Sequence, residues 1–341
     1  IREDYNKFAV DFSRITNDEK RVLAKMFYPF CDPCGVGTAF ILVRALQNES
    51  LKSAKKWAKF DEKNAGGKSN PYLIPLARGQ EKWLLDLVAL GTVCDIVGLV
   101  DENRVNVLWG LRVMQKTRRP GLRALLAVAK SDIHSVNSET LGFVLGPRLN
   151  AAGRMDTADW ALELLKLHDV KTAALNSAEL KSQSDVNARA LFLAQKLDTL
   201  NKNRRKIQDE VFAEAKTAVE KKFVRDAVLV VDGAGWHEGI IGIVAAKLLE
   251  RFSKPTFVLS RGEPETVTKI DEKTGAEIDE KVAFAKGSGR SFGGFSMAAA
   301  IHNADEIIER GGGHLAAGGL TVRVDRIADF RESVQKMYSM L

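Results

Sequence analysis

A glycine-rich stretch near the end of the chain has the composition of a phosphate-binding loop. Residues 311–319 read Gly-Gly-Gly-His-Leu-Ala-Ala-Gly-Gly, so one imidazole, that of His314, stands among glycines. Backbone N–H groups approach a phosphate closely where side chains are absent, and glycine reaches the positive φ angles that turn successive N–H groups inward. The stretch predicts a phosphate seat on a loop between a helix and a strand, with a plain glycine-rich turn as the alternative.

Two further stretches combine guanidinium groups with small residues. The first, residues 146–155, contains Arg148, Asn150 and Arg154, and the second, residues 287–291, contains Ser288 and Arg290. Planar guanidinium forks suit phosphate oxygens, and small neighbours let a backbone come close. Both stretches predict anion binding. For the first stretch, a loop whose arginines pair with internal carboxylates explains the pattern equally well.

One carboxylate occupies a segment of small and apolar residues. Asp95 follows Thr-Val-Cys and precedes Ile-Val, just after a predicted helix over residues 80–90 that ends at Gly91. Burying a carboxylate without a partner costs several kcal/mol, so Asp95 is expected to be paired, to cap a helix or to bind a cation. Metal ligation is one of three open interpretations.

A strand, helix and strand pattern predicts a βαβ unit in the C-terminal part. Residues 227–232 form an apolar strand run, a helix follows through Leu249, and residues 255–259 form a second strand run. Open α/β sheets bind ligands beyond the carboxyl ends of their strands, where Trp236 and His237 lie. Trp236 is predicted to stack on a base and His237 and Glu238 to make polar contacts, with interdomain packing as the alternative for all three.

The remaining pattern gives the elements that position these residues. No glycine or proline occurs between residues 177 and 223, which predicts one or two long helices as a connector. Ser296 is predicted to cap a helix that runs to about Ile308 and leads into the glycine stretch. A strand over residues 320–324 and a C-terminal amphipathic helix follow, and residues 261–281 are expected to form a hairpin or loop.

Length and charge set wide limits. The 341 residues, 45% of them hydrophobic, suffice for two domains, and a net charge of +7 weakly favours a polyanionic partner. No apolar run approaches the ~20 residues of a membrane span, and no signal peptide is recognisable, so a soluble cytoplasmic protein without membrane association is expected. The chain begins with Ile1, which indicates a fragment.

Taken in order, these stretches resemble motifs of the DHH/DHHA1 phosphoesterase superfamily, and within it those of exonucleases specific for single-stranded DNA. Residues 90–95 resemble the segment whose aspartate binds catalytic manganese, and residues 146–155 resemble the arginine-bearing segment near the DNA 5′ end. Residues 236–242, 287–291 and 312–314 resemble the substrate-binding motifs of the DHHA1 domain.

The resemblance runs from about Tyr28 to the end of the chain, apart from residues 52–80 and 261–281, and implies an α/β fold in three parts. These are the C-terminal portion of a DHH domain over residues 1–175, a helical connector over residues 176–224, and a DHHA1 domain with a mixed sheet over residues 225–341. In the parent enzyme, Mn²⁺ or Mg²⁺ ions generate a hydroxide that cleaves single-stranded DNA from the 5′ end.

The resemblance also implies a role for each candidate residue. Asp95 is the catalytic metal ligand. Substrate is held by Arg148, Asn150, Arg154, Trp236, His237, Ser288, Arg290, Gly312, Gly313 and His314. Single-stranded DNA is the expected partner, with a single-strand-binding protein or a helicase as further partners.

Departures from the family pattern limit the expected activity. None of the five histidines stands in an Asp-His-His motif. We also expect the OB-fold that follows DHHA1 in the family to be missing from this chain. Asp95 alone cannot hold two cations, so the metal site is expected to be incomplete and this chain inactive by itself. A phosphoesterase of the same superfamily acting on oligonucleotides or phosphonucleotides, and a non-catalytic nucleic-acid-binding replication protein, remain alternatives.

Overall fold

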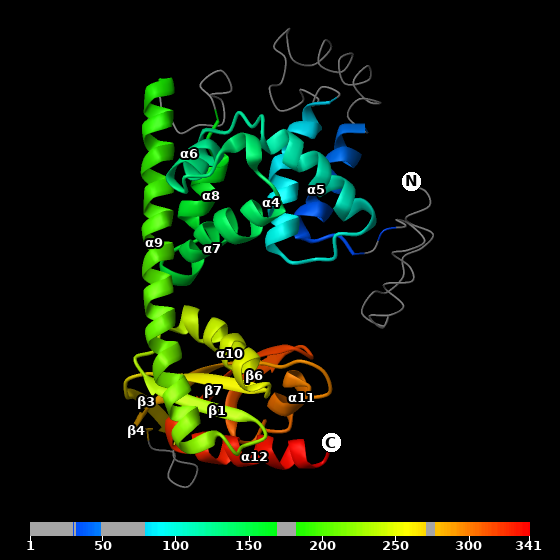
Figure 1. Cartoon of the computed structure of the whole chain (residues 1–341). Coiled ribbons are helices and arrows are strands. Elements are labelled where there is room, and N and C mark those ends of the chain that lie inside the picture. The colour runs from blue at the N-terminus through cyan, green and yellow to red at the C-terminus, as the bar shows by residue number, and fades with distance from the viewer. Residues whose placement is uncertain (1–29, 31, 49–78, 169–181, 271–276) are drawn as a thin grey trace, which may run out of the picture. The chain divides into compact units, whose positions relative to one another are not determined.

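The computed structural model describes residues 30, 32–48, 79–168, 182–270 and 277–341, which fall into two compact units (Figure 1). Unit 1 comprises the chain up to Arg148 together with Leu162–Gln195, and unit 2 comprises Leu149–Ala161 together with Lys196–Leu341. Much of the segment 52–80 and the start of the predicted connector lie outside the described residues. The domain boundaries at residues 175 and 224 stay predictions.

Unit 1 is helical in its described part. Its helices include residues 35–48, α4 (Leu85–Cys94), α5 (Asp101–Met114), α6 (Pro120–Val128) and a π-helical turn (Thr140–Leu145). The predicted helix end at Gly91 is wrong, because α4 continues to Cys94. Gly91 instead allows close packing, since a Cβ at this position would lie 2.6 Å from Val36 Cγ1.

Three helices have residues in both units. They are α7 (Gly146–Met155), α8 (Asp159–Lys166) and α9 (Gln183–Ala218). The described part of the predicted connector is thus one helix of 36 residues, followed by the π-helical segment Val219–Phe223. The absence of glycine and proline correctly indicated this long helix.

Unit 2 is built on a five-stranded mixed sheet. Its strands are β1 (Leu229–Ala234), β2 (Thr256–Arg261), β5 (Phe284–Arg290), β6 (Ile308–Gly313) and β7 (Ala317–Arg323). The strand order is β1-β2-β5-β7-β6, with β1 and β2 parallel and the other neighbours antiparallel. Helix α10 (Glu238–Phe252) joins the two parallel strands, which confirms the βαβ unit and the mixed sheet.

Helices cover both faces of this sheet (Figure 1). One core joins β1 and β2 to α10 and the end of α9, through residues such as Val231, Val244 and Ala215. The other core joins the sheet to α11 (Met297–His302) and α12 (Ile327–Ser339), where Phe257 and Phe330 meet edge to face at 5.1 Å. Alternating strand residues therefore point into two different cores.

The glycine-rich stretch is a β-hairpin and not a loop between a helix and a strand. Gly311–Gly313 end β6, residues 314–316 form the turn, and Gly318 and Gly319 belong to β7. The predicted cap of Ser296 is confirmed by its bond from Ala299 N, but α11 ends at His302, well short of Ile308. The prediction of a longer helix arose because the helical spacing of apolar residues continues through the turn after α11. Strand β6 was not predicted because three of its residues are glycines, which have low strand propensity.

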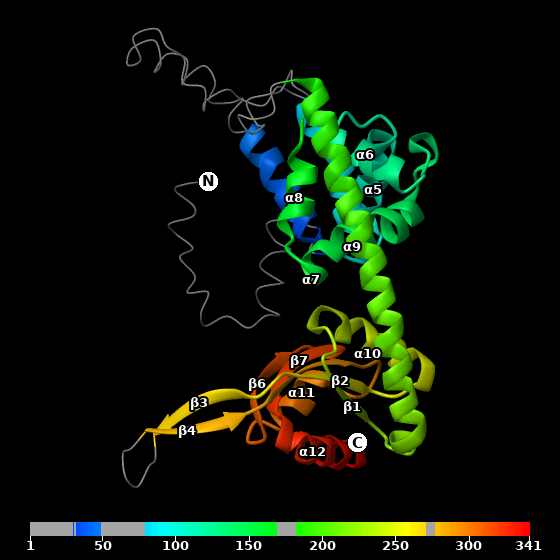
Figure 2. The ribbon, with the colours of Figure 1, turned by 90° about the vertical axis from the view of Figure 1, so that its left-hand side faces the viewer.

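The polar segment 261–281 contains the expected hairpin. Strands β3 (Glu265–Ile270) and β4 (Glu277–Val282) pair antiparallel in a sheet of their own and extend away from the main sheet, as Figure 2 shows. No helix within the described ranges combines the length and the apolar composition that crossing a membrane requires.

Candidate nucleic-acid interface

Strand β5 presents a row of polar side chains on the face of the sheet that α10 partly covers. Lys286, Ser288 and Arg290 alternate with Gly287 and Gly289, whose missing side chains would point into the opposite core. Arg290 Nη1 donates to Ser288 Oγ at 3.0 Å and to the carbonyl of Gly289 at 2.7 Å. These bonds hold the half-buried guanidinium in a fixed position next to the hydroxyl.

Two glycines on α10 leave space for the polar side chains of β5 and for Arg154. A Cβ on Gly242 would lie 2.9 Å from Arg290 Nη2 and 3.0 Å from Ser288 Oγ. Gly239, one turn earlier, lies against the end of α7, where a Cβ would be 2.2 Å from the carbonyl oxygen of Arg154. Arg154 Nη1 in turn donates to the carbonyl of Gly239 at 3.2 Å. The two glycines thus bring α7 and β5 to the first turns of α10.

Three guanidinium groups lie in this region, and in the described part of the chain no carboxylate forms a salt bridge with Arg154, Arg204 or Arg290. Burial lowers the pKa of Arg290, and the charge of Arg154 lowers it further. The pKa of Arg204, on α9, is lowered by burial first and then by Arg205 and Arg154, and the charge of Asp209 opposes this only in part. Arg204 bonds only to neutral side chains in the described residues, namely Asn201 and Gln208. Like charges that repel each other in this way favour an anion between or beside them.

His237 closes the end of β1 and begins α10. Its Nδ1 accepts the backbone N–H of Gly239 at 3.1 Å, so it caps the helix. Because Nδ1 accepts, a neutral His237 carries its proton on Nε2, which can donate to a further group. His237 is therefore a helix cap with one free donor.

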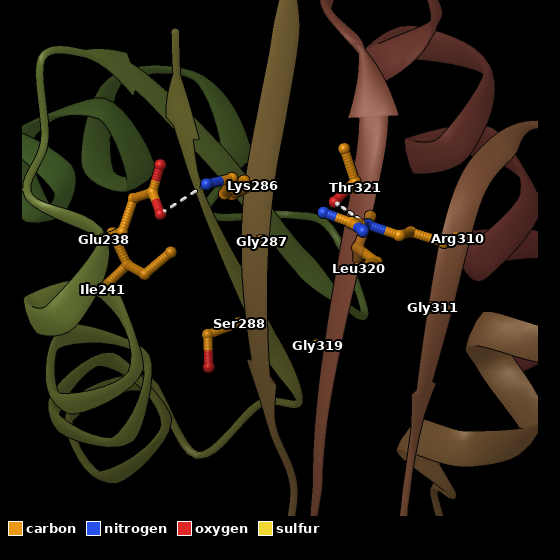
Figure 3. A pocket seen from close by; sticks show the side chains of 10 residues that line it. All are labelled: Glu238, Ile241, Lys286, Gly287, Ser288, Arg310, Gly311, Gly319, Leu320 and Thr321. Carbon is orange, nitrogen blue, oxygen red and sulfur yellow. Dashed lines mark hydrogen bonds and ion pairs between the residues drawn. The ribbon is translucent and has the colours of Figure 1, made fainter.

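A groove with a volume of about 540 Å³ runs along this face of the sheet, between α10 and strands β5, β7 and β6 (Figure 3). Its lining residues are Glu238, Ile241, Lys286, Gly287, Ser288, Arg310, Gly311, Gly319, Leu320 and Thr321. Ser288 pairs in register with Gly319, and Gly319 with Gly312. A Cβ on Gly312 would meet nothing within 4 Å, and one on Gly319 only the Gly287 oxygen at 3.7 Å. The glycines therefore give the groove a flat, open floor.

The predicted phosphate seat differs in its backbone from the expectation. Gly312 and Gly313 have no positive φ, so they belong to an extended strand and form no nest of inward-turned N–H groups. Gly313 is required by the tight hairpin, since a Cβ would lie 2.4 Å from the Ala317 oxygen. His314 occupies the turn with an exposed side chain, and its N–H donates to Ala317 O at 2.8 Å.

An exposed apolar rim lies at the same end of β5. The turn of the glycine hairpin bonds to the loop after β5, where Ser291 N donates to Ala316 O at 2.9 Å. Phe292 on this loop is 54% exposed and Leu315 on the hairpin turn is 63% exposed. The positive φ angles of Gly293 and Gly294 shape the loop. Phe292 thus follows Arg290 by two residues and stands open to solvent.

The surroundings of Trp236 favour packing over the predicted base stacking. Its side chain is only 7% exposed, and its ring packs over Gly233, where a Cβ would lie 2.2 Å from Trp236 Cε2. Its Nε1 donates to Glu214 Oε2 on α9 at 2.8 Å. Trp236 therefore packs within unit 2 and links α9 to the start of α10.

The predicted arginine loop over residues 146–155 is helix α7. Asn150 lies one turn before Arg154 on this helix, is exposed, and belongs to unit 2 with it. Arg148 belongs to unit 1, where its Nη1 donates to Val144 O at 2.8 Å. The structure thus brings Arg154, His237, Ser288 and Arg290 together around the start of α10, with Gly312 in the same register row as Ser288.

Asp95 also lies in unit 1, at the C-terminal end of α4. It is exposed, so burial imposes no need for a partner. Burial first and the charge of Asp95 second raise the pKa of the Cys94 thiol. No group of three or more His, Cys, Asp or Glu residues suited to a metal ion occurs among the described residues. The residues in hand therefore do not make up a two-metal site.

Several groove residues escaped the sequence prediction, above all Lys286, Arg310 and Thr321. The period-two pattern Lys-Gly-Ser-Gly-Arg over residues 286–290 would have indicated a strand with one polar face. Arg310 and Thr321 are cross-strand neighbours of β6 and β7, with a long contact of 3.5 Å between Nε and Oγ1. Their position in the groove follows only from the β6–β7 hairpin, which the sequence did not predict.

Comparison with known proteins identifies the family of the C-terminal domain. Residues 225–340 match the DHHA1 domain family, and they include the whole sheet, the groove and helices α10–α12. This match covers the C-terminal third of the chain and assigns these residues to the DHHA1 domain family.

Over most of its length the chain is similar to the single-stranded-DNA-specific exonuclease RecJ. It is 34% identical to RecJ of Bacillus subtilis, over 91% of this chain and 31% of that protein, and 34% identical to RecJ of Dickeya dadantii, over 91% and 47%. The crystal structure of RecJ in complex with Mn²⁺ from Thermus thermophilus matches with a TM-score of 0.59 and 25% identity, over 76% of this chain and 33% of that one. The chain thus spans less than half the length of these curated relatives.

Proposed function

We propose that this chain supplies the strand-binding part of a RecJ-like exonuclease, which hydrolyses single-stranded DNA from the 5′ end with divalent metal ions. The observation that carries the proposal is the group formed by Arg154, Ser288 and Arg290 at the start of α10. Among the described residues no carboxylate forms a salt bridge with its guanidinium groups, which lie beside the groove and its glycine floor. The substrate and the reaction in this proposal are taken from the RecJ relatives, which are single-stranded-DNA-specific exonucleases.

The groove fits a single strand better than a closed small-molecule site. Guanidinium and hydroxyl groups along β5 can hold successive phosphates, and the flat glycine floor lets a sugar–phosphate backbone lie close to the sheet. His237 can add a donor through Nε2, and His314 can add one from the hairpin turn. These contacts position a strand without reading its sequence.

Phe292 replaces Trp236 in the proposed site. Bases stack on exposed aromatic rings, and a ring close to a phosphate-binding arginine serves a single strand of any sequence. Phe292 meets this need because it is exposed and follows Arg290 by two residues. We assign base stacking to Phe292 and protein packing to Trp236.

No catalytic step is assigned to this chain. Two-metal hydrolysis needs several carboxylate or imidazole ligands, and Asp95 is one. Bound divalent ions would supply the hydroxide and stabilise the leaving oxygen. Asp95 is proposed as one ligand of such an ion, and Arg148 and Asn150 as further substrate contacts. A single-strand-binding protein or a helicase stays a predicted partner.

The experiment compares the binding of a fluorescent oligo(dT) strand by the wild-type chain and by Arg290→Gln, at several salt concentrations. Removing one phosphate contact should weaken binding and reduce the slope of log K against log salt by about 0.7. His314→Ala tests the hairpin turn in the same way. An Arg290→Gln protein that keeps the wild-type slope and affinity would overturn the proposal.

A further inference from the structure

The groove contains an ion pair, and its carboxylate would repel a phosphate. Glu238 Oε2 on α10 accepts from Lys286 Nζ on β5 at 2.8 Å, and both residues line the groove. Figure 3 shows the two side chains reaching toward each other across it. Among the groove-lining residues in the described part of the chain, only Glu238 is acidic.

Two favourable interactions of the Glu238 carboxylate would also be available to a phosphate at the same place. It lies in the first turn of α10, where the helix dipole favours a negative charge. It also neutralises Lys286, the first of the three polar residues along β5. A phosphate that entered this end of the groove would have to displace the carboxylate.

The pair is weak enough to be displaced. The side chains of Lys286 and Glu238 are 52% and 56% exposed, so water screens their attraction and each retains conformational freedom. By contrast, Arg290 is half-buried and held by Ser288 and Gly289. Lys286 is thus a cation under competition inside the groove, whereas Arg290, two residues beyond Ser288 on the same strand, is held in place.

We propose that Glu238 is an intramolecular competitor for the phosphate site of Lys286, and that it limits the affinity of the groove for a single strand. This inference rests on the proposed function, because it assigns a phosphodiester group as the ligand of Lys286. A limited affinity suits a protein that must release and re-engage a strand as it moves along it. Glu238 is therefore a residue that sets affinity, without contact to the reacting atoms.

The test uses three variants in the same salt-dependent binding assay. Glu238→Gln frees Lys286 and should steepen the salt slope by about 0.7, which corresponds to about eightfold tighter binding at 50 mM salt if both proteins bind equally at 1 M. Lys286→Gln leaves an unpaired carboxylate in the groove and should weaken binding. The double variant removes both charges and should restore the wild-type slope.

Glu332→Gln provides the matched control. Glu332 pairs with Lys336 at 2.7 Å on α12, at similar exposure, and α12 packs on the opposite face of the sheet. This variant changes the net charge by the same amount and should leave the slope unchanged. If Glu238→Gln binds no more tightly than Glu332→Gln, or more weakly than wild type, the inference is wrong. Should Arg290→Gln have no effect either, the proposed function itself fails.

Discussion

Gly242→Ala should separate strand binding from stability. The added Cβ would lie 2.9 Å from Arg290 Nη2 and 3.0 Å from Ser288 Oγ, and both are ends of side chains. A comfortable carbon contact needs ~3.5 Å, so the guanidinium has to withdraw by roughly half an ångström. The helix itself gains up to about 1 kcal/mol, because alanine has a higher helix propensity than glycine.

The expected result is a protein that melts at the wild-type temperature or up to about 3 °C higher, but binds oligo(dT) more weakly. A hydrogen bond to a charged group contributes about 1.5–3 kcal/mol, so losing part of one phosphate contact should raise Kd about tenfold. The salt slope should fall toward that of Arg290→Gln. Thermal melting and fluorescence anisotropy measure the two effects on the same sample.

Two comparisons make the experiment decisive. Gly153→Ala, on α7, would place a Cβ 3.5 Å from Ala158 Cβ, an ordinary contact, and should leave binding unchanged. Gly239→Ala would push against the backbone carbonyl of Arg154 at 2.2 Å and should destabilise the fold. Wild-type affinity in folded Gly242→Ala would refute the role of Arg290, and an unfolded protein would refute the claim that only side chains must move.

Two further predictions test the separate roles of Trp236 and Phe292. Trp236→Phe loses the 2.8 Å hydrogen bond to Glu214 and part of a buried ring. Urea unfolding should therefore show a free energy of unfolding lower by about 2 kcal/mol, while Kd for oligo(dT) stays unchanged. A large change in Kd without a change in stability would show that Trp236 contacts the strand. Phe292→Ala should weaken binding by about 1–3 kcal/mol with an unaltered salt slope, because it removes stacking and no charge; unchanged affinity across the salt series would show that no base stacks there.

Local sequence patterns were sufficient for the elements whose signals are local. The βαβ unit, the cap at Ser296 and the long helix α9 follow from apolar runs, a side-chain acceptor and the absence of helix breakers. The types of several candidate ligands were also evident, since Arg154, Ser288 and Arg290 stand among small residues in the chain. The resemblance to the superfamily arose from the order of these motifs.

Tertiary structure alone decided which of these residues meet. Sequence could not show that Trp236 is buried, because an aromatic ring beside a glycine loop serves packing and stacking equally well until its neighbours are known. It could not show that three glycines form a strand, because they lack the side chains from which strand pairing is inferred. The groove, its glycine floor and the Glu238–Lys286 pair exist only because β5, β7 and β6 lie side by side and α10 crosses above them.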